Sequence, residues 1–215
     1  MEENIAILIA DLTGYTALTE THGSFSAADM IDRFQAIIET CLVGDSRVHE
    51  RTGDEVMIIS RSADFLLATA IMMIKKTSVE ENFLQVHGGL HYGKILKRNN
   101  RYFGSPINLV SRIASKAEAG SFWCSDEFVN SLAEKSLTAL LPKGKHSFKN
   151  IHEEKELFMI SGEFESLFFI DPVCRMLLLD TNKAVKHPES KNIFFCSTNC
   201  LNIYTKNDLK KVEVY

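Results

Sequence analysis

The segment ILIADLTGYT at positions 7–16 decides the fold, because an apolar strand there runs directly into a carboxylate, a glycine turn and the start of a helix. A carboxylate at the end of a strand offers hard oxygen atoms to Mg²⁺, and the free N–H groups of such a turn favour phosphate oxygens. The segment therefore predicts a site for a metal-bound phosphate at Asp11. The alternative is that Asp11 is only the N-cap of the next helix, and other residues must join it before the site is specific.

The size and composition of the chain restrict the classes of protein it can belong to. Its 215 residues, of which 45% are hydrophobic, can bury one substantial core and a small second module. The longest apolar run, residues 65–74, is too short for a membrane span, which needs about 18 residues. The acidic start of the chain does not resemble a signal peptide, so we expect a cytoplasmic protein without a membrane span. A net charge of −4 without a cluster of Lys or Arg argues against nucleic acid as a partner.

Hydrophobic periodicity predicts alternating strands and helices over residues 1–161. The expected strands cover residues 5–10, 46–51, 55–60, 84–92 and 94–102, with Gly88, Gly89 and Gly93 marking bulges or close backbone approach. The expected helices run from a capping box at 26–29 to Gly44, over residues 62–77, and from Ser105, followed by Pro106, to Gly120. Cys41 lies on a buried helical stripe and is interpreted as packing. His87 and His91 share one face of a strand about 13 Å apart, too far for one metal ion, and are interpreted as structural.

Three further polar side chains follow the apolar elements. Asp54 lies in the turn TGD at 52–54, so the tip of a hairpin carries a carboxylate. Asn108 and Arg112 are four residues apart, so an amide and a guanidinium project together from one helix face, away from its apolar stripe. Taken singly, Asn108 and Arg112 fit a polar face in solvent better than a site. The order of all four residues along the chain makes the functional interpretation specific.

In this order and spacing the chain resembles the class III adenylyl and guanylyl cyclases over about residues 5–161. The family pattern is an Asp before a short Gly-Phe-Thr turn, a Gly-Asp hairpin, and Phe/Trp-Gly-x-x-Val-Asn-x-x-x-Arg. It is matched by DLTGYT at 11–16, GD at 53–54 and FGSPINLVSR at 103–112, with softer matches at 89–93 and 148–151. The resemblance implies an α/β (α+β) fold with a ferredoxin-like βαββαβ core, and a cyclase domain at residues 1–161.

The resemblance also implies a reaction and a set of site residues. The ribose 3′ oxygen of a purine nucleoside triphosphate attacks the α-phosphate, and two Mg²⁺ or Mn²⁺ ions per active site stabilise the two oxyanions. The implied metal ligands are Asp11 and Asp54, and the implied catalytic residues are Asn108 at the ribose and Arg112 at the α-phosphate. The implied phosphate-binding residues are Thr13, Gly14, Tyr15, Thr16 and, late in the domain, Lys149. In the family each site takes residues from two subunits, so a homodimer is expected.

Two positions that read the purine base in the family give a mixed signal here. Glu50, three residues before Gly53, stands where adenylyl cyclases usually have Lys and guanylyl cyclases Glu. A glutamate accepts hydrogen bonds from N1–H and the 2-amino group of guanine, which adenine does not offer. Arg101 departs from both types: it can pair with Glu50 and remove it from base reading, or donate to guanine O6. GTP is favoured over ATP, and either purine stays open.

The last part of the chain carries a different pattern. DPVCRM at 171–176 and FFCSTNC at 194–200 look like a YHS domain, a module related to the TRASH metal-binding motif, with Arg175 in place of the usual Gly. Cys174, Cys196 and Cys200 would suit Zn²⁺ or Cu(I), and the fourth ligand is open. The alternative is a small core that buries three thiols. Residues 171–215 carry seven Lys or Arg and five Asp or Glu, which give a net charge of +2, whereas the rest of the chain has a net charge of −6. We place a linker at residues 162–170, where the pattern of the first domain ends.

The sequence thus predicts a nucleotidyl cyclase domain followed by a small cysteine-containing module that senses metal or redox state. One rival is a catalytically inactive cyclase homologue that binds nucleotide or only dimerises. Another is a metal-handling protein in which the cyclase fold is the scaffold. The four polar residues argue for catalysis, whereas Arg101 argues for the inactive homologue.

Overall fold

The computed structural model describes the chain except for residues 1, 100, 134, 136–137, 150, 152, 162–168, 175, 179–180 and 213–215. The side chains of residues 170, 177 and 207–212 are also outside this description. Asn150 of the softer family match, Arg175, and most of the expected linker at 162–170 therefore lie outside the described residues.

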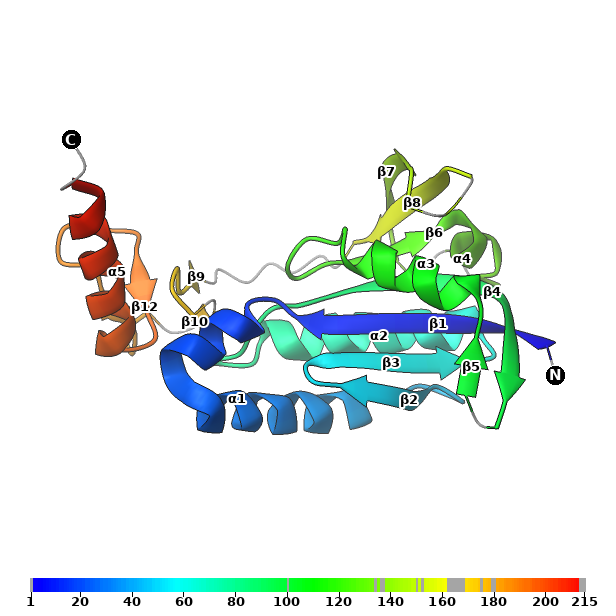
Figure 1. Cartoon of the computed structure of the whole chain (residues 1–215), viewed down its shortest axis with the longest axis horizontal. Coiled ribbons are helices and arrows are strands. Elements are labelled where there is room, and N and C mark those ends of the chain that lie inside the picture. Colours follow the sequence, from blue (N-terminus) through cyan, green and yellow to red (C-terminus); the bar gives the residue numbers. More distant parts are fainter. Residues whose placement is uncertain are drawn as a thin grey trace.

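A large mixed sheet forms the centre of the first 160 residues (Figure 1). Its strands, in the spatial order β2-β3-β1-β4-β6-β8-β7, are β2 (Arg47–Thr52), β3 (Glu55–Ser60), β1 (Glu2–Leu12), β4 (Val86–Arg98), β6 (Phe122–Ser125), β8 (Lys155–Ile160) and β7 (Leu140–His146). A short strand, β5 (Arg101–Phe103), pairs with the far end of β4. The segment from β1 to β4 alternates as βαββαβ, so the predicted α+β class with its ferredoxin-like core is confirmed.

The two faces of β1 belong to different hydrophobic clusters. Ala6, Leu8, Ala10 and Leu12 pack against α1 (Tyr15–Glu39) and α2 (Ala63–Ser78), whereas Ile5, Ile7 and Ile9 pack on the face covered by α3 (Ser105–Ala114). Alternation along a strand places Asp11 on the α3 face, next after Ile9. A short helix, α4 (Asp126–Asn130), follows β6.

Three sequence expectations for the element boundaries were wrong. Residues 84–92 and 94–102 do not form two strands, because β4 continues through Gly93 and turns only at Asn99, whose φ is 50°. The segment at 26–29 is not a helix start, because α1 is already helical from Tyr15 and is interrupted only at Gly23, with φ 81° and ψ 171°. Gly104, not Ser105, holds the cap position of α3, and that helix ends at Ala114, well before Gly120.

Gly89 explains how α3 approaches the sheet so closely. A Cβ atom on Gly89 would lie 2.5 Å from the backbone nitrogen of Ala114 and 2.6 Å from the carbonyl oxygen of Val110. Contacts this short to backbone atoms cannot be relieved by a side-chain rotation, so the helix requires glycine here. The expectation of close backbone approach at this position is confirmed.

The described tail is a small unit around three buried side chains, Cys174, Phe195 and Cys200. It contains β9 (Phe169–Ile170) paired with β10 (Leu177–Leu178), β11 (Val185–Lys186) paired with β12 (Phe194–Phe195), and α5 (Thr198–Val212). In Figure 1 it lies at the end of the molecule where α1 begins, away from β7 and β8. Within the described residues, no helix has the length and apolar character needed to cross a bilayer.

Candidate functional site

The structure brings Asp11 and Asp54 together at one end of the inner strands β1 and β3. β1 pairs with β3 so that Ala10 faces Val56, which places the hairpin turn before β3 beside Asp11. Burial, and then the hydrogen bond and the charge of the neighbouring Asp11 carboxyl, raise the pKa of Asp54 to about 6. Two carboxylates this close repel each other when both are ionised, so a cation between them would relieve the repulsion.

His87 is a member of this site that the sequence interpretation missed. It lies opposite Asp11 in the β1–β4 register, and its Nδ1 atom is 2.9 Å from Oγ1 of Thr13. Burial lowers the pKa of His87, although the charge of Asp54 acts in the opposite direction. Only the strand pairing reveals this position, because His87 is far from Asp11 in the sequence.

The turn at residues 13–16 presents backbone donors at the same place. The Thr13 amide donates to the carbonyl of Gln85 at 2.8 Å, which anchors the start of the turn. Gly14 has a left-handed backbone with φ 90° and caps α1 without a side-chain hydrogen bond, so the first amides of the helix stay available. Thr16 is exposed, and Tyr15 is half-buried. The N-terminus of α1 therefore has the donors that an anion requires.

Asn108 and Arg112 lie on α3, where Asn108 is exposed and Arg112 half-buried. Within the described part of the chain, no hydrogen bond or ion pair joins either residue to Asp11 or Asp54. Lys149 is exposed in the loop after β7, and the described contacts do not join it to this site either. Among the described contacts, the carboxylates and the turn come together within one chain, and no hydrogen bond or ion pair joins the amide and the guanidinium to them.

Glu50 and Arg101 are both exposed, on β2 and β5. The two strands meet where the ring of His49 contacts Tyr102, with centroids 4.7 Å apart. A cavity of about 460 Å³ beside β2 is lined in part by His49 and Glu50. No ion pair between Glu50 and Arg101 is found among the described residues, so the described contacts do not show the pairing that would remove Glu50 from base reading.

His91 belongs to a separate buried polar network. Its Nδ1 atom lies 2.8 Å from Oγ of Ser125, and burial lowers its pKa to about 4. Nearby, Lys155 donates to Glu127 at 2.6 Å. The network lines a cavity of about 340 Å³ beside α3. Its internal hydrogen bonds agree with the structural interpretation of His91.

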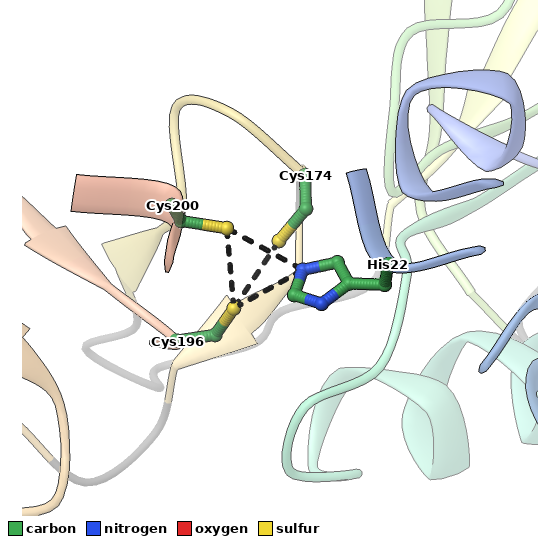
Figure 2. Close-up of side chains that lie close together, drawn as sticks. All are labelled: His22, Cys174, Cys196 and Cys200. Carbon is green, nitrogen blue, oxygen red and sulfur yellow. Dashed lines mark hydrogen bonds between the residues drawn. The ribbon is translucent and has the colours of Figure 1, made fainter. Parts of the chain in front are cut away.

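The three tail cysteines converge, and a histidine from α1 joins them (Figure 2). Cys196 Sγ lies 3.4 Å from Cys174 Sγ and 3.6 Å from Cys200 Sγ, and the three thiols are free. His22 Nε2 lies 3.4 Å from Cys200 Sγ and 3.6 Å from Cys196 Sγ. Hydrogen bonds from Cys174 and Cys196 lower the pKa of Cys200. The sequence interpretation named the cysteines but not His22.

The backbone around the cysteines is held by two polar side chains. Asp171, which is fully buried, accepts from the amides of Val173 and Cys174 through Oδ1 and from the amide of Cys196 through Oδ2, at 2.8, 3.2 and 2.7 Å. The hydroxyl of Ser197 accepts from the Cys200 amide at 3.3 Å, as an N-cap of α5 does. Cys200 therefore lies in the first helical turn, where the helix dipole favours a thiolate.

Comparison with known proteins points to the cyclases. No family model matches the chain. An adenylate cyclase of Glutamicibacter nicotianae is 29% identical over 117 residues, which are 54% of this chain and 29% of that protein. The solved adenylyl cyclase CyaB from P. aeruginosa is 18% identical with a TM-score of 0.63, covering 78% of this chain and 98% of that one. A solved adenylate cyclase from Trypanosoma brucei is 15% identical with a TM-score of 0.68, covering 82% and 93%.

These likenesses differ in what they show. The solved structures establish the fold of this chain as that of the cyclase catalytic domain. The chain spans about 30% of the length of the curated relatives it matches. The names of the relatives, together with the fold, support a class III adenylyl or guanylyl cyclase catalytic domain.

Proposed function

We propose that residues 1–161 form a nucleotidyl cyclase domain, which converts GTP or ATP to the 3′,5′-cyclic nucleotide and pyrophosphate. The observation that carries the proposal is the meeting of Asp11 and Asp54 beside the open N-terminus of α1. In the proposed arrangement, residues 171–215 form a separate YHS-like module. The relatives and the solved structures support the cyclase class, and the substrate is part of the proposal.

The two carboxylates at the end of β1 and at the start of β3 fit a divalent metal ion. Asp11 and Asp54 supply carboxylate oxygens, which Mg²⁺ and Mn²⁺ prefer over nitrogen and sulfur, and burial together with the neighbouring Asp11 carboxyl raises the pKa of Asp54. When bound, two such ions would stabilise the charge on the attacking and leaving oxygens. The carboxylates of Asp11 and Asp54 would hold these ions, and the turn at 13–16 orients the β- and γ-phosphates through its amides and the Thr16 hydroxyl.

Asn108, Arg112 and Lys149 act on the rest of the substrate in this proposal. The Asn108 amide fixes the ribose so that its 3′ oxygen lies in line with the leaving group. Arg112 donates hydrogen bonds to the α-phosphate, whose negative charge increases as the bond to the attacking oxygen forms. Lys149 contacts the triphosphate. In this proposal, as the cyclase resemblance implies, Asn108 and Arg112 are supplied to the carboxylates by a second copy in a head-to-tail homodimer.

Mixing two inactive variants tests the shared site. Asp11→Ala and Arg112→Ala proteins should each be inactive, whereas their mixture should regain cyclic-nucleotide production, because the heterodimer assembles one intact site. The matched control is a mixture of Asp11→Ala and Asp54→Ala, which damages the same half of every site and should recover nothing. Absence of recovery in the first mixture, despite demonstrated subunit exchange, would contradict the two-chain geometry.

Assays of the purified protein with GTP and with ATP in Mn²⁺ decide between catalysis and its rival. The departure at Arg101 from both family types is the specific observation that favours a catalytically inactive homologue. Formation of either cyclic product, lost in Asp11→Ala, would exclude that rival. Binding of the triphosphate without turnover would favour it.

A further inference from the structure

We infer that His22 completes a zinc site with Cys174, Cys196 and Cys200, so that one metal ion joins the tail to the first segment of α1. The four ligand atoms come from two parts of the chain, and all lie within 4.8 Å of one another. Figure 2 shows the imidazole beside the three thiols, with one ring nitrogen facing them from the side of α1. The inference concerns the tail and α1 and does not depend on the cyclase activity.

Four of the six distances between the ligand atoms are close to the edges of a coordination tetrahedron. With Zn–S bonds of about 2.3 Å and Zn–N bonds of about 2.05 Å, tetrahedral angles give S–S edges of about 3.8 Å and S–N edges of about 3.6 Å. Two of the three S–S distances are 3.4 and 3.6 Å, and two of the three S–N distances are 3.4 and 3.6 Å. The remaining two pairs, Cys174 with Cys200 and Cys174 with His22, lie within 4.8 Å. A zinc ion therefore fits with movements of a few tenths of an ångström at these edges.

The ligand types favour zinc over the other occupants of a thiol cluster. Three cysteines and one histidine in a closed tetrahedral set are typical of structural zinc. A disulfide needs sulfur atoms about 2.05 Å apart, and the closest of the pairs described above is at 3.4 Å. Cu(I) is also bound by thiolates, but three sulfurs with an added imidazole as fourth ligand suit Zn²⁺ better.

The surroundings of the cluster preorganise the ligands. Asp171 fixes the backbone of Cys174 and of Cys196 with one carboxylate, so the two cysteine loops cannot move independently. Cys200 is placed by the first turn of α5, where its thiolate is favoured. Such outer hydrogen bonds orient the ligands of structural metal sites, and their loss typically weakens metal binding 10- to 100-fold.

The metal would add a direct link between the tail and the first segment of α1, through His22. Other described contacts join the tail to the first domain as well: Asn199 Nδ2 donates to the Thr21 carbonyl at 3.3 Å, Lys183 lies 3.8 Å from Glu81, and Met176 forms a β-bridge with Leu84 and packs against the main core. Gly23 interrupts α1 immediately after His22, so residues 15–22 form a short helical segment distinct from the rest of the helix. A metal ligand at the end of this segment would fix its position relative to the tail.

Titration of the full-length reduced protein with Zn²⁺ or Co²⁺ tests the site. We expect one ion per chain, and with Co²⁺ the charge-transfer and d–d absorption of a tetrahedral thiolate complex. His22→Ala should lower the Zn²⁺ affinity at least about 10-fold and weaken or shift the d–d bands, because a water molecule replaces a nitrogen ligand. Asn199→Ala, which removes a neighbouring contact but no ligand, should leave both unchanged.

Hydrogen exchange of the same proteins tests the link to α1. Removing zinc from the parent should increase exchange in residues 15–22 and in the tail, while α2 provides an internal reference for the folded core. In His22→Ala, zinc removal should affect the tail alone. The inference is wrong if His22→Ala keeps the parental Zn²⁺ affinity and Co²⁺ spectrum, if residues 15–22 are insensitive to zinc, or if the reduced protein binds only Cu(I).

Discussion

Replacing Asp54 by asparagine should stabilise the metal-free protein while it abolishes the proposed cyclase activity. Asp54 is held with its pKa raised from 3.8 to about 6, so the folded state is penalised whenever this carboxyl is ionised. A rise of this size corresponds to about 3 kcal/mol. Because the carboxyl is partly exposed and screened by solvent, we expect about 1 kcal/mol in practice. Asparagine keeps the shape and removes the charge.

The sign of the pH dependence follows from the raised pKa. Above about pH 6 the folded parent carries the ionised Asp54 next to Asp11, and the asparagine variant gains its full advantage. Between pH 6 and 4 the folded parent takes up a proton that the unfolded chain does not, so the difference between the two proteins shrinks. Below about pH 4 both forms of the parent are protonated, and the difference should vanish.

Thermal unfolding in buffer without divalent cations measures the effect. At pH 7.5 the asparagine variant should unfold at a temperature higher by about 2–4 °C for each 1 kcal/mol gained. Adding Mn²⁺ should raise the melting temperature of the parent and not that of the variant. Asp45→Asn is a matched control of opposite sign, because a hydrogen bond from Ser60 lowers the pKa of Asp45, and its loss should destabilise the protein. An Asp54→Asn protein that is less stable than the parent at pH 7.5 would refute the reasoning.

The remaining predictions concern the packing of α3 and the substrate. Gly89→Ala should lower the free energy of unfolding by about 1–3 kcal/mol, measured by urea titration, because the new Cβ meets the backbone of α3. Glu50→Lys should reduce the ratio of kcat/KM for GTP over ATP, and an unchanged ratio would remove Glu50 from base reading. His87→Asn should lower kcat/KM about 10-fold or more without loss of folding, since His87 positions Thr13; wild-type kinetics would make His87 merely structural.

The sequence predicts most of the core fold because its signals are local. The strand before Asp11, the hairpin at Asp54 and the third helix each follow from apolar periodicity and turn residues within a dozen positions. The predicted boundaries of strands and helices are wrong where contacts between residues distant in the sequence determine them. Gly93 stays inside β4 because that strand pairs with β1 through this point, and the glycine is needed for space under Pro106 rather than for a break.

The site shows the same division between local and distant signals. Asp11 and Asp54 are recognised from motifs, whereas His87 becomes part of the site only when β4 pairs antiparallel with β1. His22 is 174 positions from Cys196, and its sequence neighbours give no sign of a metal ligand. The sequence analysis therefore found three ligands of the tail cluster and left the fourth open, because the fourth depends on where the tail docks.

The two proposed sites act on one structural element, and this has a thermodynamic consequence. Residues 15–22 begin at the turn that presents amides to the phosphates and end at His22, about 12 Å along the helix axis. If zinc at His22 favours the position of this segment that binds nucleotide, nucleotide must raise the affinity for zinc by the same factor. The tail would then report metal occupancy to the phosphate turn without any contact with the nucleotide. If zinc and nucleotide raise each other's affinity by the same factor, and both effects are lost in His22→Ala, residues 15–22 are the element whose position both ligands bias. If the nucleotide affinity does not depend on zinc, Leu18, which is buried in the core, holds the segment in place without the metal.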